Sequence, residues 1–205
     1  MAPLRVGLTG GLASGKSTVA KLLAEAGFQV VDGDEIVARL YAPGQPGARA
    51  VAEIFGAKYL SKGGGVDKPR LARLVFADDA ARATLEAAIH PLVRAFFSRL
   101  ATAAADPTDL ASARSQAIVL EATRLVEAGY SPDFDLIVTV EASPEIQLER
   151  AVARGLPRDE ALRRLAAQGD GAERRAAAHR VIQNDGSKQE LLEKVAELVA
   201  EIRRR

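Results

Sequence analysis

The sequence lacks cysteine altogether and contains only two histidines, His90 and His179. Without cysteine there is no disulfide framework, no thiolate metal site and no cysteine nucleophile. Two imidazoles alone are a poor basis for the donor sets that zinc prefers, which disfavours a zinc site. The disulfide-stabilised and thiol-dependent classes of protein are therefore excluded.

An excess of charge and a long apolar run are also missing. The 28 Lys and Arg residues nearly balance the 27 Asp and Glu residues, so the net charge of +1 gives no global argument for binding nucleic acid or a membrane. No apolar stretch approaches the length of a membrane span, and the first expected strand leaves no room for a signal peptide. We expect a cytoplasmic protein, and no sequence feature indicates a protein partner.

Glycines are concentrated near the N-terminus, where an apolar run over residues 4–8 leads into Gly10-x-x-x-x-Gly15-Lys16-Ser17 and then a helical pattern. Glycines in such a loop let successive backbone N–H groups turn inward around an anion. The following helix adds its positive N-terminal end. The loop therefore predicts a phosphate-binding cradle for ATP, formed by Gly10, Gly11, Leu12, Ala13, Ser14, Gly15, Lys16, Ser17 and Thr18.

The same pattern can arise by chance or in an unrelated glycine-rich turn, but here it lies between an expected strand and an expected helix. In that context Lys16 can reach the β- and γ-phosphates, and the Ser17 hydroxyl can bind Mg²⁺. The cradle alone leaves open how the nucleotide is used, because kinases, GTPases and motors share it.

Two carboxylates, Asp32 and Asp34, end the next predicted strand over residues 28–34. Ligands in open α/β sheets bind beyond the carboxyl ends of the strands, so we expect both acids beside the cradle. There a carboxylate can bind Mg²⁺ through water or accept the proton of an attacking hydroxyl. The alternative is that one of them, most readily Asp32, caps a helix beginning near Glu35.

Residues 35–115 form a mainly helical insertion that is too long for a simple crossover. We expect it to lie over the site and to select the second substrate. Within it, Pro91 predicts an interruption of the helical run with a kink near Ile89, and His90 reads as a packing residue. Phe96 and Phe97 are expected in the core.

Residues 116–121 are an apolar run that ends in Glu121, the form of a strand whose terminal carboxylate faces Mg²⁺ or its water shell. A chance placement of this acid is the alternative. A short helix over 123–129 and a buried strand over 134–140 are predicted next. Val181 and Ile182 indicate a last strand, which is followed by a closing helix over 191–202.

Arginines are frequent on the helices expected after Ser143, which is a plausible N-cap. Arg150 and Arg154 lie one turn apart and share a face, as a lid that neutralises a transferring phosphoryl group requires. The competing interpretation is a solvated, salt-bridged surface. That alternative is strongest for Arg163, Arg164, Arg174 and Arg175.

Taken together, these features resemble the dephospho-coenzyme A kinase family over nearly the whole chain. The resemblance rests on the order and spacing of Thr9 to Thr18, Asp32-Gly-Asp34, Leu71-Ala-Arg-Leu-Val-Phe76, Leu85-Glu-Ala-Ala-Ile-His-Pro91, Gln147-Leu-Glu-Arg150 and Val181-Ile-Gln-Asn184. The chain departs from the family pattern in and just after the predicted lid, at Ala167, Gly171 and His179.

The resemblance implies an α/β P-loop NTPase fold with a five-stranded parallel sheet, a helical substrate-binding insertion and a helical lid. It implies one P-loop kinase unit with a core of residues 1–34, 116–142 and 178–205, an insertion of 35–115 and a lid of 143–177. The implied activity is transfer of the ATP γ-phosphate to the 3′-hydroxyl of dephospho-CoA, with Mg²⁺.

By the same likeness, Asp34 is the general base, and Lys16 and Arg150 complete the catalytic set. Arg150, Arg154 and Asn184 join the cradle in binding ATP. Metal ligands are expected from Ser17, Asp32 and Glu121. Substrate contacts are expected from Asp32, Asp34, Leu74, Phe76, His90 and Glu121.

Two rival functions remain at this point. One is a kinase for another nucleoside or nucleotide, since the insertion indicates a bulky acceptor without naming it. The other is a nucleotide-dependent switch or binding module, which the absence of a guanine-reading Asn-Lys-x-Asp disfavours.

Overall fold

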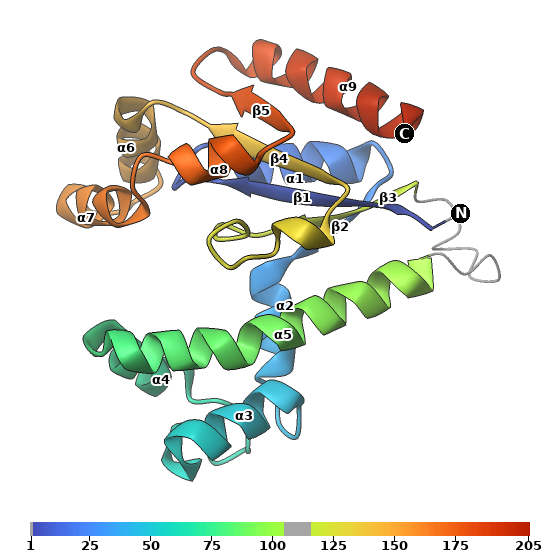
Figure 1. Cartoon of the computed structure of the whole chain (residues 1–205). Coiled ribbons are helices and arrows are strands. Elements are labelled where there is room, and N and C mark those ends of the chain that lie inside the picture. Colours follow the sequence, from blue (N-terminus) through green and yellow to red (C-terminus); the bar gives the residue numbers. More distant parts are fainter. Residues whose placement is uncertain (1, 105–115) are drawn as a thin grey trace. The chain divides into compact units, whose positions relative to one another are not determined.

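The computed structural model describes residues 2–104 and 116–205 (Figure 1). The chain divides into two compact units, Met1–Val31 with Ala101–Arg205, and Asp32–Leu100. The predicted insertion ends at residue 115, and its last part, 105–115, lies outside the described residues. Each unit is described separately below.

The first unit is built on a five-stranded sheet in the order β2-β3-β1-β4-β5. Its central strand β1 pairs in parallel with β3 and β4, so that Val6 lies opposite both Val119 and Leu136. The predicted five-stranded parallel sheet is confirmed. The strands are β1 (Leu4–Gly10), β2 (Gln29–Asp32), β3 (Ala117–Glu121), β4 (Leu136–Glu141) and β5 (Arg180–Gln183).

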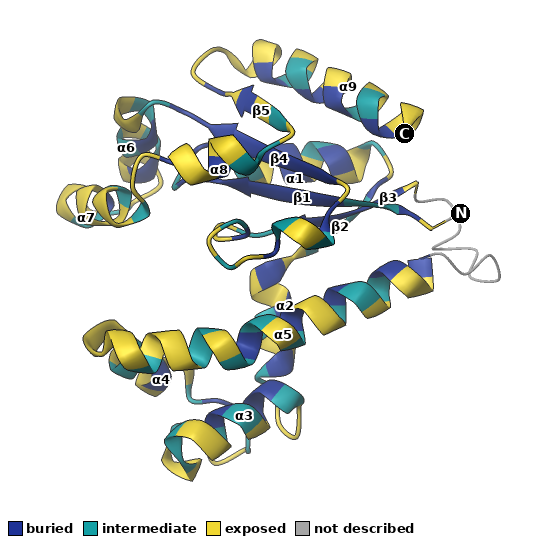
Figure 2. Cartoon of the chain, viewed as in Figure 1, coloured by how far each residue is buried: buried dark blue, intermediate teal, exposed yellow. Residues whose placement is uncertain are grey.

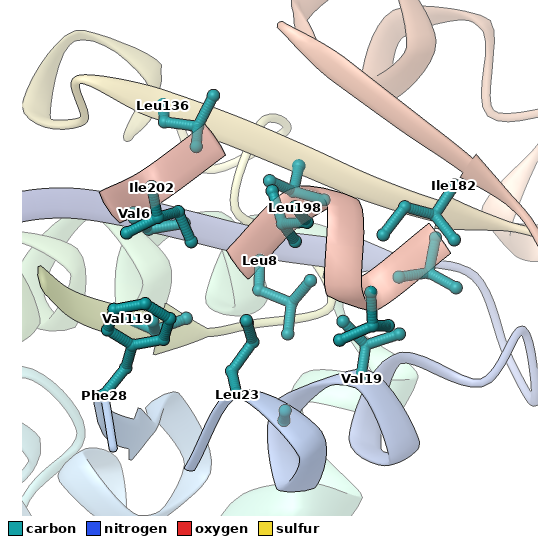
Figure 3. Close-up of a cluster of buried hydrophobic side chains, with 14 of the residues drawn as sticks. Val6, Leu8, Val19, Leu23, Phe28, Val119, Leu136, Ile182, Leu198 and Ile202 are labelled. Atoms are coloured by element: carbon teal, nitrogen blue, oxygen red, sulfur yellow. The ribbon is translucent and has the colours of Figure 1, made fainter. Parts of the chain in front are cut away.

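Two helices, α1 and α9, cover one face of this sheet (Figure 3). Alternate residues of β1, Val6 and Leu8, pack there against Leu23 of α1 and Leu198 of α9, and all four are fully buried. Burial of such side chains is the main stabilising term for the fold, at roughly 1.5–3 kcal/mol each. The helices of this unit are α1 (Lys16–Glu25), α6 (Pro144–Ala153), α7 (Arg158–Gln168), α8 (Ala172–Ala177) and α9 (Lys188–Arg204), with a 3-10 turn η2 (Ser131–Asp133).

The segment after β3 differs from the prediction. The expected helix over 123–129 is wrong, because these residues form hydrogen-bonded turns that end at Gly129 with φ +72°. Leu125 is fully buried, and a Cβ on Gly7 would overlap its side chain. The packing of Leu125 on β1 therefore fixes the turns of this segment. A helix of only seven residues is not stable by itself, so no strong helical preference opposes this packing.

The second unit is helical and begins where β2 ends. Asp32 is the N-cap of α2, because its carboxylate accepts a hydrogen bond of 2.8 Å from the Asp34 N–H. The capping interpretation of Asp32 is thus confirmed, and the helix begins two residues earlier than expected. The elements are α2 (Gly33–Leu40), α3 (Pro46–Phe55), a 3-10 turn η1 (Ala57–Tyr59), α4 (Lys68–Ala77) and α5 (Asp79–Ala104).

Helix α5 continues through Pro91, so the predicted interruption of the helical run is wrong. Proline removes one backbone donor, but Ile89, Val93 and Phe97 recur at four-residue spacing and are all buried. This apolar stripe stabilises the helix on both sides of Pro91. Phe96 was expected in the core and instead remains half-buried, whereas Phe97 is 2% exposed.

Figure 2 shows many exposed residues along these helices, between the buried ones. Within residues 2–104 and 116–205, no helix has the length and apolar character needed to span a membrane. A small core of Ala48, Val51, Val66 and Leu71 holds the first part of the helical unit together.

Candidate active site

The loop between β1 and α1 presents unsatisfied backbone donors. Among the described residues, no protein acceptor pairs with the N–H groups of Ala13, Gly15, Lys16 or Ser17. Ala13 adopts φ +53°, a conformation that costs an L-residue roughly 1–2 kcal/mol. A strained loop with free donors at the start of a helix is the geometry of an anion-binding site.

Gly15 is required by both conformation and space. Its φ is +106°, and a Cβ there would overlap the side-chain nitrogen of Asn184. That amide group donates a 2.7 Å hydrogen bond to the Ser14 carbonyl, and Arg150 donates a 3.0 Å hydrogen bond to the Asn184 carbonyl. Asn184 and Arg150 therefore support the loop through the Ser14 carbonyl. Neither residue is among those that line the pocket over the loop, and their predicted contacts with ATP stay predictions.

The substitution Gly15→Ala tests this support. We expect it to weaken ATP binding by at least about tenfold, because the new methyl group displaces Asn184 and reshapes the loop. Gly27→Ala is the matched control, since Gly27 also has a positive φ, +96°, but no atom lies near its missing Cβ. The control is expected to lose about 1 kcal/mol of stability and to keep its affinity for ATP. Equal affinities for ATP in the two variants, measured by calorimetry, would contradict the assignment.

Glu121 contacts both Lys16 and Ser17, the lysine and the hydroxyl residue that end the loop. Its carboxylate lies 2.6 Å from the Lys16 ammonium and accepts a 2.8 Å hydrogen bond from the Ser17 hydroxyl. Lys16 and Glu121 are both largely buried, with 14% and 12% of their side chains exposed. Glu121 thus ends β3 beside the loop, and its predicted role toward Mg²⁺ stays a prediction.

A hydroxyl and a carboxylate side by side are hard oxygen donors, which is the set that Mg²⁺ prefers. Among the described residues there is no group of three or more His, Cys, Asp or Glu side chains that could hold a metal alone. Mg²⁺ in such sites takes one or two protein ligands and completes its shell with water and substrate phosphates. Ser17 and Glu121 therefore fit Mg²⁺ that arrives with a nucleotide.

A pocket of about 320 Å³ opens over the loop and is bordered by α7 and by Arg154, the residue that follows α6. Two arginines, Arg154 and Arg164, line it together with Thr123 and Gln168. Gln168 accepts a 2.8 Å hydrogen bond from the Leu12 N–H, so the end of α7 is joined directly to the loop. The pocket thus combines backbone donors, one lysine and two guanidinium groups, a set that neutralises a polyphosphate.

The other arginines of this region have different surroundings. Arg163 and Arg164 both pair with Glu160, and hydrogen bonding from Arg164 lowers the pKa of the Glu160 carboxyl. The salt-bridge interpretation therefore holds for Arg163, whereas Arg164 also faces the pocket. For Arg174 the salt bridges are present, with Glu127 and Glu141, but the expected solvated position is wrong, because the side chain is buried.

The entry to α6 is fixed by Asp185, which follows β5. Its carboxylate accepts a 2.7 Å hydrogen bond from the Ser143 N–H, and this bond is the main cause of the lowered pKa of Asp185. Ser143 is the N-cap residue, as predicted, but its own side chain makes no capping hydrogen bond.

The remaining predicted site residues belong to the helical unit. Asp34 is exposed in the first turn of α2. Phe76, on α4, is 87% exposed, although phenylalanine is among the residues most often buried. Leu74 and His90 are half-buried on α4 and α5. Their predicted contacts with substrate stay predictions.

Sequence reasoning missed Gln168 as a partner of the loop and gave Arg164 no firm role. A signal was available, because the two residues are four apart on one helix and so share a face. Nothing local in the sequence indicates that this face meets the glycine loop, more than 140 residues earlier in the chain.

A parallel five-stranded sheet whose first strand leads into an open phosphate-binding loop, with arginines over that loop, defines a P-loop kinase. Comparison with known proteins narrows the class. The family model described as "Dephospho-CoA kinase" matches residues 4–190. The chain belongs to the dephospho-CoA kinase family, as the sequence motifs predicted.

A curated relative agrees with this assignment, and two solved structures share the fold. The dephospho-CoA kinase of Streptomyces avermitilis is 42% identical over 201 residues, which cover 97% of this chain and 94% of that protein. The solved structure of TT1252 from Thermus thermophilus has a TM-score of 0.74 and 34% identity, over 98% of each chain. Dephospho-CoA kinase from Campylobacter jejuni shares the fold, with a TM-score of 0.68 and 23% identity over 97% of this chain and 96% of its own.

Proposed function

We propose that this chain transfers the γ-phosphoryl group of ATP to the 3′-hydroxyl of dephospho-CoA and releases coenzyme A and ADP. The observation that carries the proposal is the open phosphate cradle, with its free N–H groups, Lys16 and two arginines, in a member of the dephospho-CoA kinase family. A kinase for another nucleoside or nucleotide and a non-catalytic nucleotide switch are not favoured, because the family match spans most of the chain.

The cradle holds the triphosphate. Free N–H groups of the loop donate to the phosphate oxygens, and Lys16 moves from Glu121 to the β- and γ-phosphates. Arg154 and Arg164 stabilise the negative charge that spreads over the transferring group, which is the larger part of catalysis in phosphoryl transfer. Arg150 acts through Asn184 as a support of the loop.

Mg²⁺, when bound, would neutralise negative charge on the phosphates and the leaving group. Ser17 and Glu121 would hold it, with Asp32 contributing through water. Asp32 retains a carboxylate oxygen for this purpose, because only Oδ1 caps α2.

Asp34 is the proposed general base. It accepts the proton of the 3′-hydroxyl as that oxygen forms a bond to the γ-phosphorus, and the bond from the γ-phosphorus to the β–γ bridging oxygen breaks. The electron pair of the broken bond leaves with ADP. Support comes from its place two residues after β2, since parallel strands bring ligands to their carboxyl ends.

The helical insertion, residues 35–115, is proposed to hold the acceptor, and residues 143–177 to act as the lid. Within the insertion, the exposed ring of Phe76 offers an apolar contact, with Leu74 on the same helix and His90 on α5. These assignments follow the family likeness, as does a cytoplasmic location.

A pair of neighbouring arginines tests the proposed active site. Arg164→Gln is expected to lower kcat/KM for ATP by about 10-fold to 100-fold, because one guanidinium is lost from the pocket. Arg163→Gln is the control: both side chains pair with Glu160, but only Arg164 lines the pocket. ADP release, followed with dephospho-CoA and Mg²⁺, measures both. Equal losses in the two variants would mean that the effect comes from the helix surface.

A further inference from the structure

A cavity of about 560 Å³ lies within the helical unit Asp32–Leu100, and no residue of the cradle lines it. It is formed by the end of α2, the loop that follows, the start of α3 and the later part of α5 (Figure 1 labels these helices). Three arginines line it, Arg39, Arg49 and Arg99.

The three guanidinium groups have no anionic partner among the residues that the structure describes. Within residues 2–104 and 116–205, no ion pair or side-chain hydrogen bond involves them, and no acidic residue of these ranges lines the cavity. By contrast, arginines elsewhere on these surfaces do find partners, for instance Arg82 with Asp79 at 3.0 Å. Three like charges around one cavity repel each other, so the cluster is unfavourable for folding unless an anion binds.

Arg49 adds to this imbalance, because it lies in the first turns of α3, where the helix dipole is positive. That turn contains no acidic residue, and Gln45 makes no side-chain capping hydrogen bond. A cation near the N-terminus of a helix is unfavourable, because the helix dipole is positive there. Departures of this kind are expected at functional sites.

Apart from Gln45, the rest of the lining is apolar or aromatic. Phe96 is half-buried, and the Arg99 guanidinium lies 5.6 Å from the centre of its ring. Leu40 and Pro46 complete the apolar part of the wall. A ligand of this cavity therefore carries an apolar or planar portion besides its negative charges, and the volume suits a molecule of nucleotide size.

We propose that this cavity binds a small molecule that carries two or more phosphate groups. Guanidinium groups match phosphate oxygens in paired hydrogen bonds, and three of them suit a pyrophosphate or bisphosphate better than a single carboxylate. Such phosphates have two sources: the diphosphate of the acceptor proposed above, or a separate phosphorylated effector. The site itself does not depend on the identity of the acceptor.

Fluorescence can report on this cavity alone, because the chain contains no tryptophan. In the full chain carrying Phe96→Trp, inorganic pyrophosphate and adenosine 3′,5′-bisphosphate are expected to change the emission saturably, with a Kd below about 1 mM. Arg49→Gln or Arg99→Gln in that background is expected to weaken binding at least about tenfold each. Arg82→Gln, on the same helix as Arg99, and Lys16→Met, in the cradle, are expected to leave the Kd unchanged.

Steady-state kinetics then separates the two sources. A rise in KM for dephospho-CoA in Arg49→Gln and Arg99→Gln, with KM for ATP unchanged, identifies the acceptor's diphosphate as the ligand. An unchanged KM identifies a separate effector, and either result supports the site when binding is lost. No saturable change with either probe, or an equal loss in Arg82→Gln, would overturn the proposal. If Phe96→Trp does not fold, calorimetry of the unmodified chain against Arg49→Gln gives the same comparison.

Discussion

Asp34→Asn is expected to lower kcat by about 100-fold to 10,000-fold while the Kd for ATP changes by less than about threefold. Asparagine has nearly the same shape as aspartate, but its amide cannot accept the proton of the 3′-hydroxyl. Asp34 is exposed and its side chain makes no hydrogen bond that the structure describes, so the substitution removes no packing. Turnover and ATP titration on the same preparation measure the two effects.

The neighbouring Glu35→Gln is the control for Asp34→Asn. Glu35 is also exposed in the first turn of α2, so its loss changes the charge of the helix N-terminus by the same amount. It is expected to keep kcat within about threefold, since surface charges contribute little. Comparable losses of turnover and ATP affinity in Asp34→Asn, or equal losses of turnover in both variants, would rule out the role of base.

Lys16→Met is expected to lower kcat/KM for ATP by about 100-fold to 1,000-fold, as removal of a donor to developing charge does in other enzymes. Methionine keeps the length of the side chain and removes the ammonium that contacts Glu121. It also leaves the Glu121 carboxylate without its cation, so the melting temperature is to be measured alongside activity.

Lys21→Met is the matched control, since Lys21 lies on the same helix and its side chain is 77% exposed. Its pair with Glu25, at 3.8 Å, is an exposed contact, and we expect activity within about twofold of the parent chain. A Lys16→Met variant that keeps activity would show that the phosphates are held by backbone donors and arginines alone.

Local patterns in the sequence were sufficient for the framework of the site. The glycine loop, the acid at the end of β3 and the short apolar strands each depend on residues close in the chain, and each lies where predicted. Parallel topology then follows from the right-handed crossover of strand, helix and strand. The family motifs supplied the rest of the fold class.

Contacts between segments far apart in the chain could not be predicted from local sequence patterns. Gln168 with Leu12, and Arg174 with Glu127 and Glu141, join side chains that only the folded sheet brings together. Charge density alone suggested a solvated surface for Arg174, because burial of an arginine is uncommon and needs paired acids elsewhere in the chain.

Two local rules were overridden by packing. Pro91 disfavours a continuous helix, yet the buried stripe of Ile89, Val93 and Phe97 carries α5 through it. The segment 123–129 has helical residues, yet Leu125 fixes it as turns against Gly7. In both segments the free energy gained by burying side chains exceeds the small secondary-structure preferences of the individual residues.

The measurement that tests the proposed function most directly offers dephospho-CoA, AMP and adenosine in parallel, each with ATP and Mg²⁺, and identifies the products by mass spectrometry and phosphorus NMR. The account predicts ADP release with dephospho-CoA and a product phosphorylated at the 3′ position of the ribose. Turnover only with AMP or adenosine, or no turnover with any acceptor while ATP still binds, would contradict it.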